Sequence, residues 1–197
     1  MCCCEKFFLG LFFFSQKKSI LDYHLLKTKK HIMKSKRLHY YKLTKNDFNY
    51  YHEMAMDINV MQMITGYIPS LDETKKWFAA HIAINRKNDE FGFFGIRKIE
   101  GDEFIGYCKI VKTADDTAEI GYALNFAFWN NGFATEISAK LVEYAMSIKS
   151  LNILIALIDP ENYASEKILR NSRFELVQTG IIGGLPSKKF RLELNRR

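Results

Sequence analysis

The chain has 197 residues, of which 48% are hydrophobic and 14% aromatic, and this is enough for one buried core. Its net charge of +7 is unevenly spread, since residues 1–36 carry eight Lys or Arg against two Asp or Glu, and residues 37–197 carry 21 against 20. Because binding to a nucleic-acid backbone needs a basic face on the folded domain, the body is not expected to bind nucleic acid.

Residues 1–33 form a basic and aromatic leader, ahead of a domain expected at residues 34–197. The apolar run of the leader, from Phe7 to Phe14, has eight residues, whereas a bilayer span needs roughly 20. No small-residue cleavage site follows the run. We favour a flexible or non-native extension, with translation starting at Met33. A membrane-surface anchor and an ordered helix packed on the domain are the alternatives.

The four cysteines indicate a reduced protein. Cys2, Cys3 and Cys4 are adjacent, and Cys108 stands alone within a strand pattern, so an ordinary disulfide framework is not expected. Neither a CxxC pair nor a His-rich spacing suggests zinc, and we expect no metal. Cys108 has no paired histidine nearby in sequence and is expected to be a small buried hydrophobe. The body is therefore expected to be cytoplasmic.

The body follows strand and helix patterns in turn. Strand patterns fall at residues 36–44, 91–99, 103–113, 117–126, 152–158, 174–180 and 188–194. Helix patterns fall at residues 47–57, 70–88, 135–148 and 162–174, and residues 59–70 are expected to form a short helix followed by a Gly/Pro break. This order predicts an α/β (α+β) fold, with a three-stranded meander followed by a strand–loop–helix–strand unit in one mixed sheet.

Local signals refine three of these elements. Thr44 or Asn46 is expected to cap the first helix, and Ser70 with Glu73 has the capping-box spacing. The continuous apolar run at residues 152–158 predicts a strand that is buried on both faces.

Gly132 lies in the stretch FWNNGFATEI, where a strand gives way to an amphipathic helix. The N-terminus of a helix presents unpaired N–H groups and the positive end of a dipole, and a glycine lets a phosphate come close to the backbone. A simple turn would use the same glycine, and no Gly-Lys-Ser/Thr follows as in a Walker loop. This segment alone leaves both interpretations open.

Three motifs occur in order along the body: EIGYAL, W-x-x-G-F-A-T-E and D-P-E-N-x-A-S-x-K-x-L. With them the chain resembles the GCN5-related N-acetyltransferase (GNAT) family over residues 37–194, in particular the branch that contains the ribosomal-protein N-terminal acetyltransferases. The resemblance implies a mixed, mostly antiparallel sheet flanked by helices. It also implies that the fourth and fifth strands splay apart around the pantetheine arm of acetyl-CoA.

The resemblance further implies which residues bind the cofactor. Strand backbone would pair with the pantetheine arm, loop amides would hold the pyrophosphate, and two polar side chains of the following helix would touch the arm. These three groups are, in order, Leu124, Asn125 and Phe126; Asn131, Gly132, Phe133, Ala134 and Thr135; and Asn162 and Ser165.

Four positions depart from the family pattern. Asn130 and Asn131 precede the motif glycine, and asparagine tolerates left-handed turn geometry. Arg173 stands where a glycine is usual, so it is strained if the position needs a positive φ. Leu169 replaces the tyrosine that protonates the thiolate in many relatives, which leaves the acid unassigned.

Acetyl transfer to an amine needs a proton acceptor for the incoming ammonium and a proton donor for the thiolate. By resemblance, Glu119 is the expected acceptor and Ser165 the expected donor. A solvent-facing strand glutamate and a hydroxyl bonded to its own helix are the alternatives. Tyr107 and Tyr122 either line the acceptor side or belong to the core.

The expected function is direct transfer of an acetyl group from acetyl-CoA to a primary amine, either a small molecule or a protein N-terminus. The alternative is a catalytically idle CoA-binding module used for sensing or partner binding. Five acidic residues either attract a cationic acceptor or are simply solvated: Asp57, Asp72, Glu73, Asp115 and Asp116. The identity of the amine and the choice between monomer and homodimer stay open.

Overall fold

The computed structural model describes residues 31–194, so the predictions for the leader up to residue 30 lie outside the described residues. Its strands are β1 (His31–Lys34), β2 (Leu38–Lys42), β3 (Gly92–Lys98), β4 (Phe104–Ala114), β5 (Thr117–Leu124), β6 (Ile153–Ile158), β7 (Glu175–Ile182) and β8 (Leu185–Glu193). Its helices are α2 (Phe48–Ala55), α3 (Ile58–Met61), α4 (Leu71–Lys87), α5 (Phe133–Ser147) and α6 (Tyr163–Asn171). Two 3-10 turns cover Lys45–Asp47 and Phe126–Phe128.

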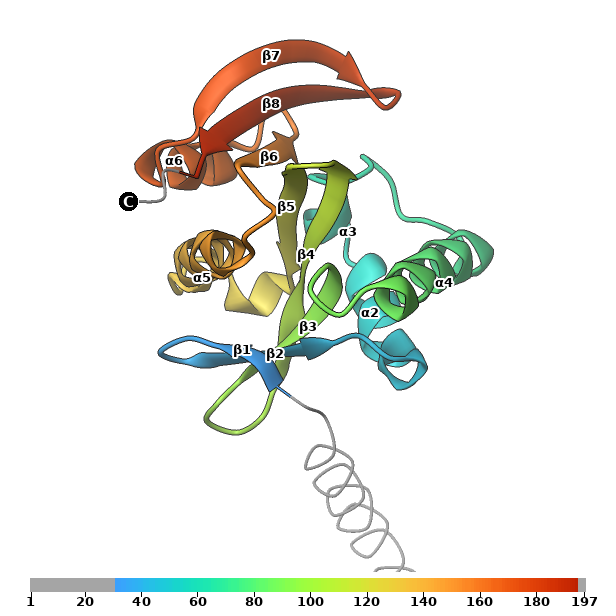
Figure 1. The fold of residues 1–197 in the computed structure, drawn as a ribbon. Coiled ribbons are helices and arrows are strands. Elements are labelled where there is room, and N and C mark those ends of the chain that lie inside the picture. Colours follow the sequence, from blue (N-terminus) through green and yellow to red (C-terminus); the bar gives the residue numbers. More distant parts are fainter. Residues whose placement is uncertain (1–30, 195–197) are drawn as a thin grey trace, which may run out of the picture. The chain divides into compact units, whose positions relative to one another are not determined.

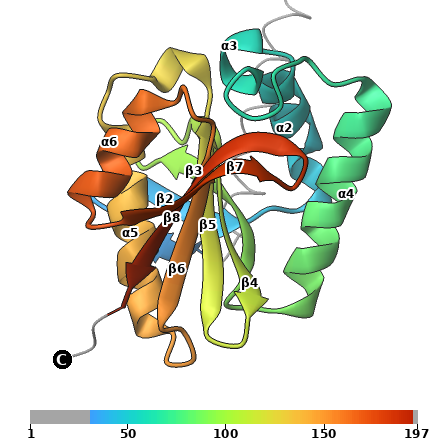
Figure 2. The same ribbon diagram turned by 90° about the horizontal axis from the view of Figure 1, so that it is seen from above.

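The strands form one eight-stranded sheet in the order β1-β2-β3-β4-β5-β6-β8-β7. Within it, β5 and β6 run parallel and the other neighbours run antiparallel. Helices α5 and α6 cover one face of the sheet, and α2, α3 and α4 cover the other (Figures 1 and 2). The predicted fold class, with a mixed and mostly antiparallel sheet between helices, is confirmed.

Strand β1 is an element that the sequence patterns missed. It pairs antiparallel with β2, so His31 to Met33, which the prediction assigned to the leader, belong to the sheet. Met33 is buried in the main core cluster. The four residues of β1 are too few to show a recognisable alternation of polar and apolar side chains. The strand is stabilised by its pairing with β2 rather than by the intrinsic propensity of its residues. Within residues 31–194, no helix is long and apolar enough to cross a membrane.

Each face of the sheet has its own core. Under α5, apolar residues at helical spacing pack on alternate residues of the central strands, among them Ile137, Leu141, Ala145, Ile110, Ala118 and Ile120. Under α2 and α4, an aromatic cluster joins helix and strand residues: Tyr51, Phe78, Ile82, Phe93 and Phe104. Side chains of one strand thus point alternately to the two cores, as the period of a β-strand requires.

The prediction that residues 152–158 form a strand buried on both faces was wrong. In β6, Leu154 and Ala156 are buried beneath α5, but Ile155 and Leu157 on the opposite side are only half-buried. The difference arises because Leu157 lines a cavity instead of a packed layer. The predicted capping box is present, with the Ser70 hydroxyl accepting from the Glu73 N–H at 3.3 Å and Glu73 accepting from the Ser70 N–H at 2.9 Å.

Arg173 has a φ of 66°, so the expected strain is present. It follows α6 in a Schellman motif, in which Phe174 N–H donates to Leu169 O and Arg173 N–H donates to Arg170 O, both at 3.0 Å. We expect Arg173→Gly to raise the free energy of unfolding by about 1 kcal/mol, since glycine adopts this backbone conformation freely. Urea denaturation measures the change.

The matched control is Arg173→Ala, which removes the same charge but keeps the Cβ atom. This variant is expected to stay within about 0.5 kcal/mol of the parent chain. An equal gain in both variants would show that the guanidinium, and not the backbone, was the source of instability.

Candidate functional site

Strands β5 and β6 pair over only part of their length. Their register runs from Thr117 opposite Ile153 to Ile120 opposite Ala156, and no pairing between them continues beyond Ile120 in the described structure. Strand β6 meanwhile continues its pairing with β8 as far as Ile158. The predicted splay of the central strand pair is therefore confirmed, and it leaves the segment Gly121 to Leu124 with an open edge toward β6.

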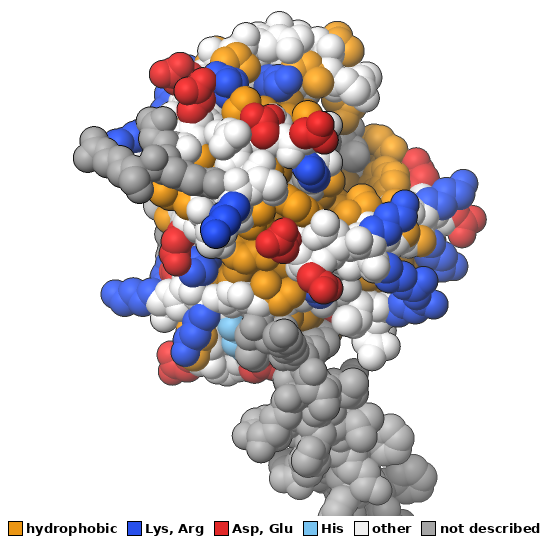
Figure 3. Space-filling view, in the orientation of Figure 1, with side chains coloured by type: hydrophobic (Ala, Val, Ile, Leu, Met, Phe, Trp, Pro, Cys, Tyr) orange, Lys and Arg blue, Asp and Glu red, His pale blue; other side chains and the backbone are white. Residues whose placement is uncertain are grey.

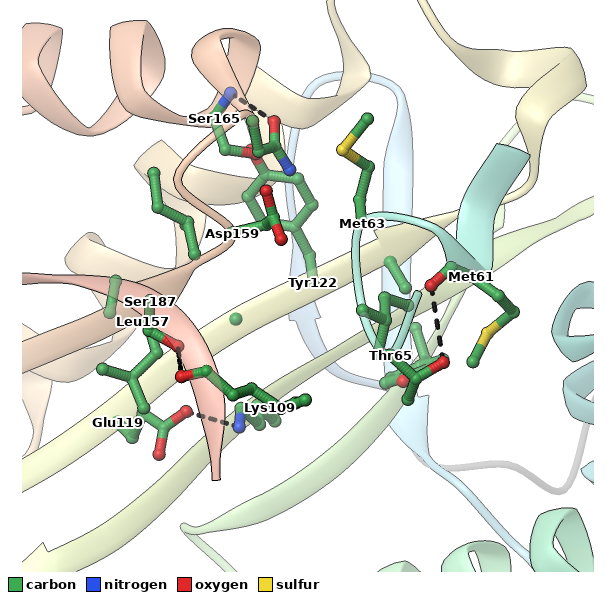
Figure 4. Close-up of a pocket in the computed structure, with 18 of the residues that line it drawn as sticks. Met61, Met63, Thr65, Lys109, Glu119, Tyr122, Leu157, Asp159, Ser165 and Ser187 are labelled. Atoms are coloured by element: carbon green, nitrogen blue, oxygen red, sulfur yellow. Dashed lines mark hydrogen bonds and ion pairs between the residues drawn. The ribbon is translucent and has the colours of Figure 1, made fainter. Parts of the chain in front are cut away.

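A cavity of about 650 Å³, the larger of two that adjoin here, passes through this gap. On one side it is lined by residues of α2, α3 and α4, and on the other by Asn162 and Ser165 of α6 and its N-cap. Figure 4 shows Glu119 and Lys109 at one end of this cavity, Tyr122 and Ser165 at another, and Met61 to Thr65 across from them. Its size is within the range of small-molecule sites.

A second cavity, of about 280 Å³, adjoins the first. Both share Tyr122, Ala123, Asn162 and Ser165 in their walls. The second is also lined by the start of α5, from Gly132 to Thr135. The two cavities thus adjoin along the open edge of β5, and together they extend from the α5 N-terminus to the space beneath α2 and α4.

The loop before α5 has the geometry of an anion site. Gly132 is the N-cap, with φ 74° and ψ 4°, and Asn130 also has a positive φ of 60°. The N–H groups of Phe133, Ala134 and Thr135 donate no hydrogen bond to any part of the chain that the structure describes. Three unpaired amides at the positive end of a 15-residue helix favour a bound anion.

Arg37 supports this loop from the turn between β1 and β2. Its Nη1 donates to Asn131 O at 3.0 Å, and its guanidinium lies 4.2 Å from the centre of the Phe133 ring. Glu136 accepts from Arg37 N–H, Arg37 Nε and Ser35 Oγ, each at 2.7 Å. Burial alone would raise the pKa of Glu136, but these hydrogen bonds hold it below its usual value. The role of Arg37 could not be predicted from the sequence, because nothing local links it to a loop 94 residues away.

The strand residues predicted to pair with the pantetheine arm are only partly at the cavities. Leu124 lines the smaller one, while its carbonyl accepts from Trp129 Nε1 at 2.9 Å. Asn125 N–H donates to Ile105 O at 2.9 Å, and Phe126 begins a 3-10 turn. Among the described residues, Asn125, Phe126 and Asn131 line neither cavity. The open edge of β5 lies instead at residues 121–124.

The polar residues of α6 lie where the two cavities meet. Asn162 caps α6 by accepting from Ser165 N–H at 3.0 Å. Ser165 Oγ lies 3.4 Å from Tyr122 Oη, within hydrogen-bonding distance. Burial raises the pKa of Tyr122, and the contact with Ser165 offsets part of the shift, so this phenol is protonated at neutral pH. Leu169, at the position of the family tyrosine, is buried in the wall beside them.

Glu119 points into the larger cavity rather than into solvent. Its carboxylate forms an ion pair with Lys109 Nζ at 2.5 Å, and the side chains are 19% and 31% exposed. His81 of α4 stacks on Phe93 with 3.6 Å between ring centroids. Burial, and next the charge of Lys109, lower the pKa of His81 to about 4, so this imidazole is neutral at pH 7. Lys109 and His81 were missed, since each is a single residue in an otherwise ordinary strand or helix pattern.

The acidic residues considered for attracting a cation lie elsewhere. Asp57 accepts from Asn59 N–H at 2.9 Å, and Glu73 accepts from Ser70 and Tyr67. Of the five, none lines either cavity among the residues described. Cys108 is fully buried and burial raises the pKa of its thiol, as expected of a core residue. Residues 31–194 contain no group of three or more His, Cys, Asp or Glu that would hold a metal ion.

Comparisons of sequence identify the family of this chain. The family model of the acetyltransferase (GNAT) domain matches residues 37–175. An uncharacterized N-acetyltransferase of Bacillus licheniformis, p20, is 36% identical over 101 residues, which cover 50% of this chain and 56% of that protein. The uncharacterized N-acetyltransferase YnaD of Bacillus subtilis (strain 168) is 30% identical over 125 residues, covering 63% and 71%. The chain thus spans little more than half of the first relative.

Solved structures share the fold. RimL, a ribosomal L7/L12 alpha-N-protein acetyltransferase in complex with coenzyme A, superposes with a TM-score of 0.70 at 16% identity, over 84% of this chain and 98% of that one. Spermidine N-acetyltransferase from Vibrio cholerae, in complex with CoA and spermine, gives a TM-score of 0.65 at 18% identity, over 80% and 96%. Since the family model covers well over half of the sequence, the chain belongs to the GNAT acetyltransferase family.

Proposed function

We propose that this chain is an N-acetyltransferase that moves the acetyl group of acetyl-CoA directly to a primary amine. The observation that carries the proposal is the pair of adjoining cavities at the gap between β5 and β6, one beside three unpaired amides at the start of α5 and the other beside the Glu119 carboxylate. A direct transfer needs the two substrates side by side, and these cavities offer a place for each of them.

The residues around the smaller cavity fit the acetyl donor. The amides of Phe133, Ala134 and Thr135 would hold the pyrophosphate, with Gly132 leaving the approach open. An ideal Cβ atom at Gly132 would meet only Arg37 Nη2, at 3.7 Å, so the space beside the loop is free of other described atoms within 4 Å. The open edge at residues 121–124 and the side chains of Asn162 and Ser165 would flank the pantetheine arm.

The chemistry then divides between two groups of this chain. Glu119 takes one proton from the incoming ammonium, directly or through water, and this frees the nitrogen lone pair. As the nitrogen attacks the thioester carbonyl, a C–N bond forms and the C–S bond breaks. The thiolate takes its proton from the hydrogen-bonded pair of Tyr122 and Ser165. After the C–N bond has formed, the nitrogen loses a second proton, and this proton replaces the one that the pair of Tyr122 and Ser165 gave to sulfur. Tyr122 thus fills the role that Leu169 leaves vacant.

The acceptor is a primary amine of a small molecule or of a protein N-terminus. Structural neighbours named for a ribosomal-protein N-terminus and for spermidine support these two classes equally. The direct test incubates the full chain with acetyl-CoA and a panel of amines and N-terminal peptides, and measures free CoA by chromatography. Release of CoA that depends on the amine is expected. Tight binding of CoA with no release for any amine would favour the idle CoA-binding module instead.

The pair of Tyr122 and Ser165 gives a sharper prediction. Both Tyr122→Phe and Ser165→Ala are expected to lower kcat by roughly tenfold or more, because each removes a hydroxyl from the path of the proton. The double variant is expected to be little worse than the worse single variant, since the two groups act as a unit. Steady-state kinetics at saturating acetyl-CoA measure all three.

Tyr144→Phe is the matched control, since this tyrosine of α5 lies outside both cavities and donates to Glu90 O at 3.0 Å. Its kcat is expected to equal that of the parent chain. Equal losses at Tyr122 and Tyr144 would mean that a tyrosine hydroxyl contributes through stability alone, and would remove Tyr122 from the mechanism.

A further inference from the structure

The part of the larger cavity beneath α2, α3 and α4 is where the acceptor amine would lie if the proposed function holds. Its walls are apolar and aromatic, with Met54, Met61, Trp77, Phe93 and Tyr107 among them. Tyr51, His81, Phe93 and Tyr107 form a continuous aromatic cluster, with neighbouring ring centroids 3.6 to 6.3 Å apart. Because His81 is neutral at pH 7, this cluster adds no charge to the wall.

The charges on the cavity wall do not all cancel. Among the described residues, the charged side chains that line the larger cavity are Lys109, Glu119 and Asp159. Lys109 pairs with Glu119 at 2.5 Å. Asp159 follows β6 and accepts from Glu161 N–H at 2.8 Å, and Figure 4 shows it beside Tyr122 and Ser165. The walls that α2, α3 and α4 contribute carry no charged side chain among the described residues.

The surface around the acceptor side is hydrophobic at the α2–α4 connection and the β7–β8 hairpin tip, and basic over α4. The connection from α2 to α4 exposes Met56, Ile58, Ile64, Tyr67, Ile68 and Leu71. Ile182, Leu185 and Pro186, at the tip of the β7–β8 hairpin, line the same cavity as Met63 to Gly66, so the hairpin lies across from this connection (Figure 2). Figure 3 shows hydrophobic side chains over the hairpin tip and the α3–α4 connection, and basic side chains over α4, which carries Lys75, Lys76, Arg86 and Lys87.

We infer that the acceptor is a primary amine on an apolar body, with no second cationic group. An apolar body would bury its surface against the aromatic and methionine side chains, and that burial is favourable. A second ammonium on that body would have to lose its water against the walls of α2, α3 and α4, which carry no carboxylate among the described residues, with Lys109 nearby. The inference rests on the proposed function, and it separates an apolar monoamine or an apolar N-terminal peptide from a polyamine.

A pair of amines that differ in one group provides the test. Hexylamine and 1,6-diaminohexane have the same reacting end and the same chain, and differ by an ammonium at the far end. With the full chain at saturating acetyl-CoA, kcat/KM is expected to be about tenfold or more higher for hexylamine, since a like charge near Lys109 and desolvation both oppose the diamine. Spermidine is expected to be poorer still. A preference for the diamine or for spermidine would overturn the inference.

Lys109→Met tests the cause of this selectivity. The variant keeps the length of the side chain but removes its charge, which leaves Glu119 without its partner. The ratio of kcat/KM for the diamine to that for hexylamine is expected to rise about tenfold. The matched control is Lys112→Met, two positions from the last β4 residue and outside both cavities, in which the ratio is expected to stay unchanged. An unchanged ratio in Lys109→Met would overturn the role of Lys109.

Two further experiments complete the test. The first asks whether the preference also holds for a peptide N-terminus, and the second distinguishes a failure of this inference from a failure of the proposed function. Amidated tetrapeptides Ala-Leu-Phe-Gly and Ala-Lys-Lys-Gly repeat the comparison for an N-terminus, and the apolar one is expected to react faster. Binding of hexylamine in the presence of CoA is followed by the fluorescence of Trp77, with Trp77→Phe as the blank. Saturable binding of hexylamine without acetylation would support the inference and overturn the enzymatic function. Acetylation restricted to amines with a second cationic group would support the enzymatic function and overturn the inference. Absence of both binding and acetylation would overturn the inference and the enzymatic function together.

Discussion

Glu119→Gln is expected to lower kcat by roughly a hundredfold while leaving the affinity for CoA unchanged, because the amide cannot take a proton from the incoming ammonium. The change keeps the shape of the side chain and its place beside Lys109. CoA binding, measured by calorimetry, should be unaffected because Glu119 does not line the smaller cavity among the described residues. Steady-state kinetics with an accepted amine give the size of the loss.

Lys109→Gln is the control for this experiment, since it breaks the same ion pair from the other side. If Glu119 only held Lys109 in place, both variants would lose the same activity. We expect the Glu119 variant to lose far more, because only the carboxylate takes part in proton transfer. Equal losses, or a Glu119→Gln variant with full kcat, would remove Glu119 from the mechanism and favour an idle binding module.

Gly132→Asp is expected to weaken the binding of CoA by roughly a hundredfold relative to Gly132→Asn, because it places a carboxylate beside the amides that would hold the pyrophosphate. Asparagine and aspartate have nearly the same shape, and both tolerate the left-handed conformation that Gly132 adopts at φ 74°. The comparison therefore isolates charge. Calorimetric titration with CoA measures it, and the difference should shrink as the salt concentration rises.

The thermal stabilities of the two Gly132 variants provide the necessary check. They should be similar, since an added Cβ atom would meet only Arg37 Nη2, at 3.7 Å. Equal CoA affinities in two equally stable variants would contradict an anion site at this loop. In that case Gly132 would serve only to turn the chain into α5.

Much of the fold could be predicted because local patterns and tertiary structure agree. The capping box at Ser70 and Glu73, and the apolar spacing of α5, each depend on residues close in sequence. Strand β1 was missed, and the burial of β6 was overestimated, because both depend on tertiary structure. Strand β1 forms through its pairing with β2. One side of β6 faces a cavity, where its apolar run had suggested a packed layer.

The candidate site divides in the same way. The turn of Gly132 into a helix could be predicted because Gly132 and the helix after it are contiguous. The open edge of β5 could not be placed correctly, since the segment where β5 and β6 part depends on both strands, and it lies at residues 121–124 rather than at Leu124 to Phe126. Arg37, His81 and Lys109 reach the site from distant segments, and only the packed structure shows that Lys109 contacts Glu119.

The contact of Arg37 with Asn131 O has a thermodynamic consequence. It connects the turn after β1, at one edge of the sheet, to the loop at the entrance of α5. A ligand that binds the loop in this conformation stabilises every contact on which the conformation depends. Opening of the β1–β2 hairpin and binding of a ligand to the loop before α5 are therefore linked equilibria. Opening of the hairpin weakens binding of the ligand, and binding of the ligand disfavours opening of the hairpin.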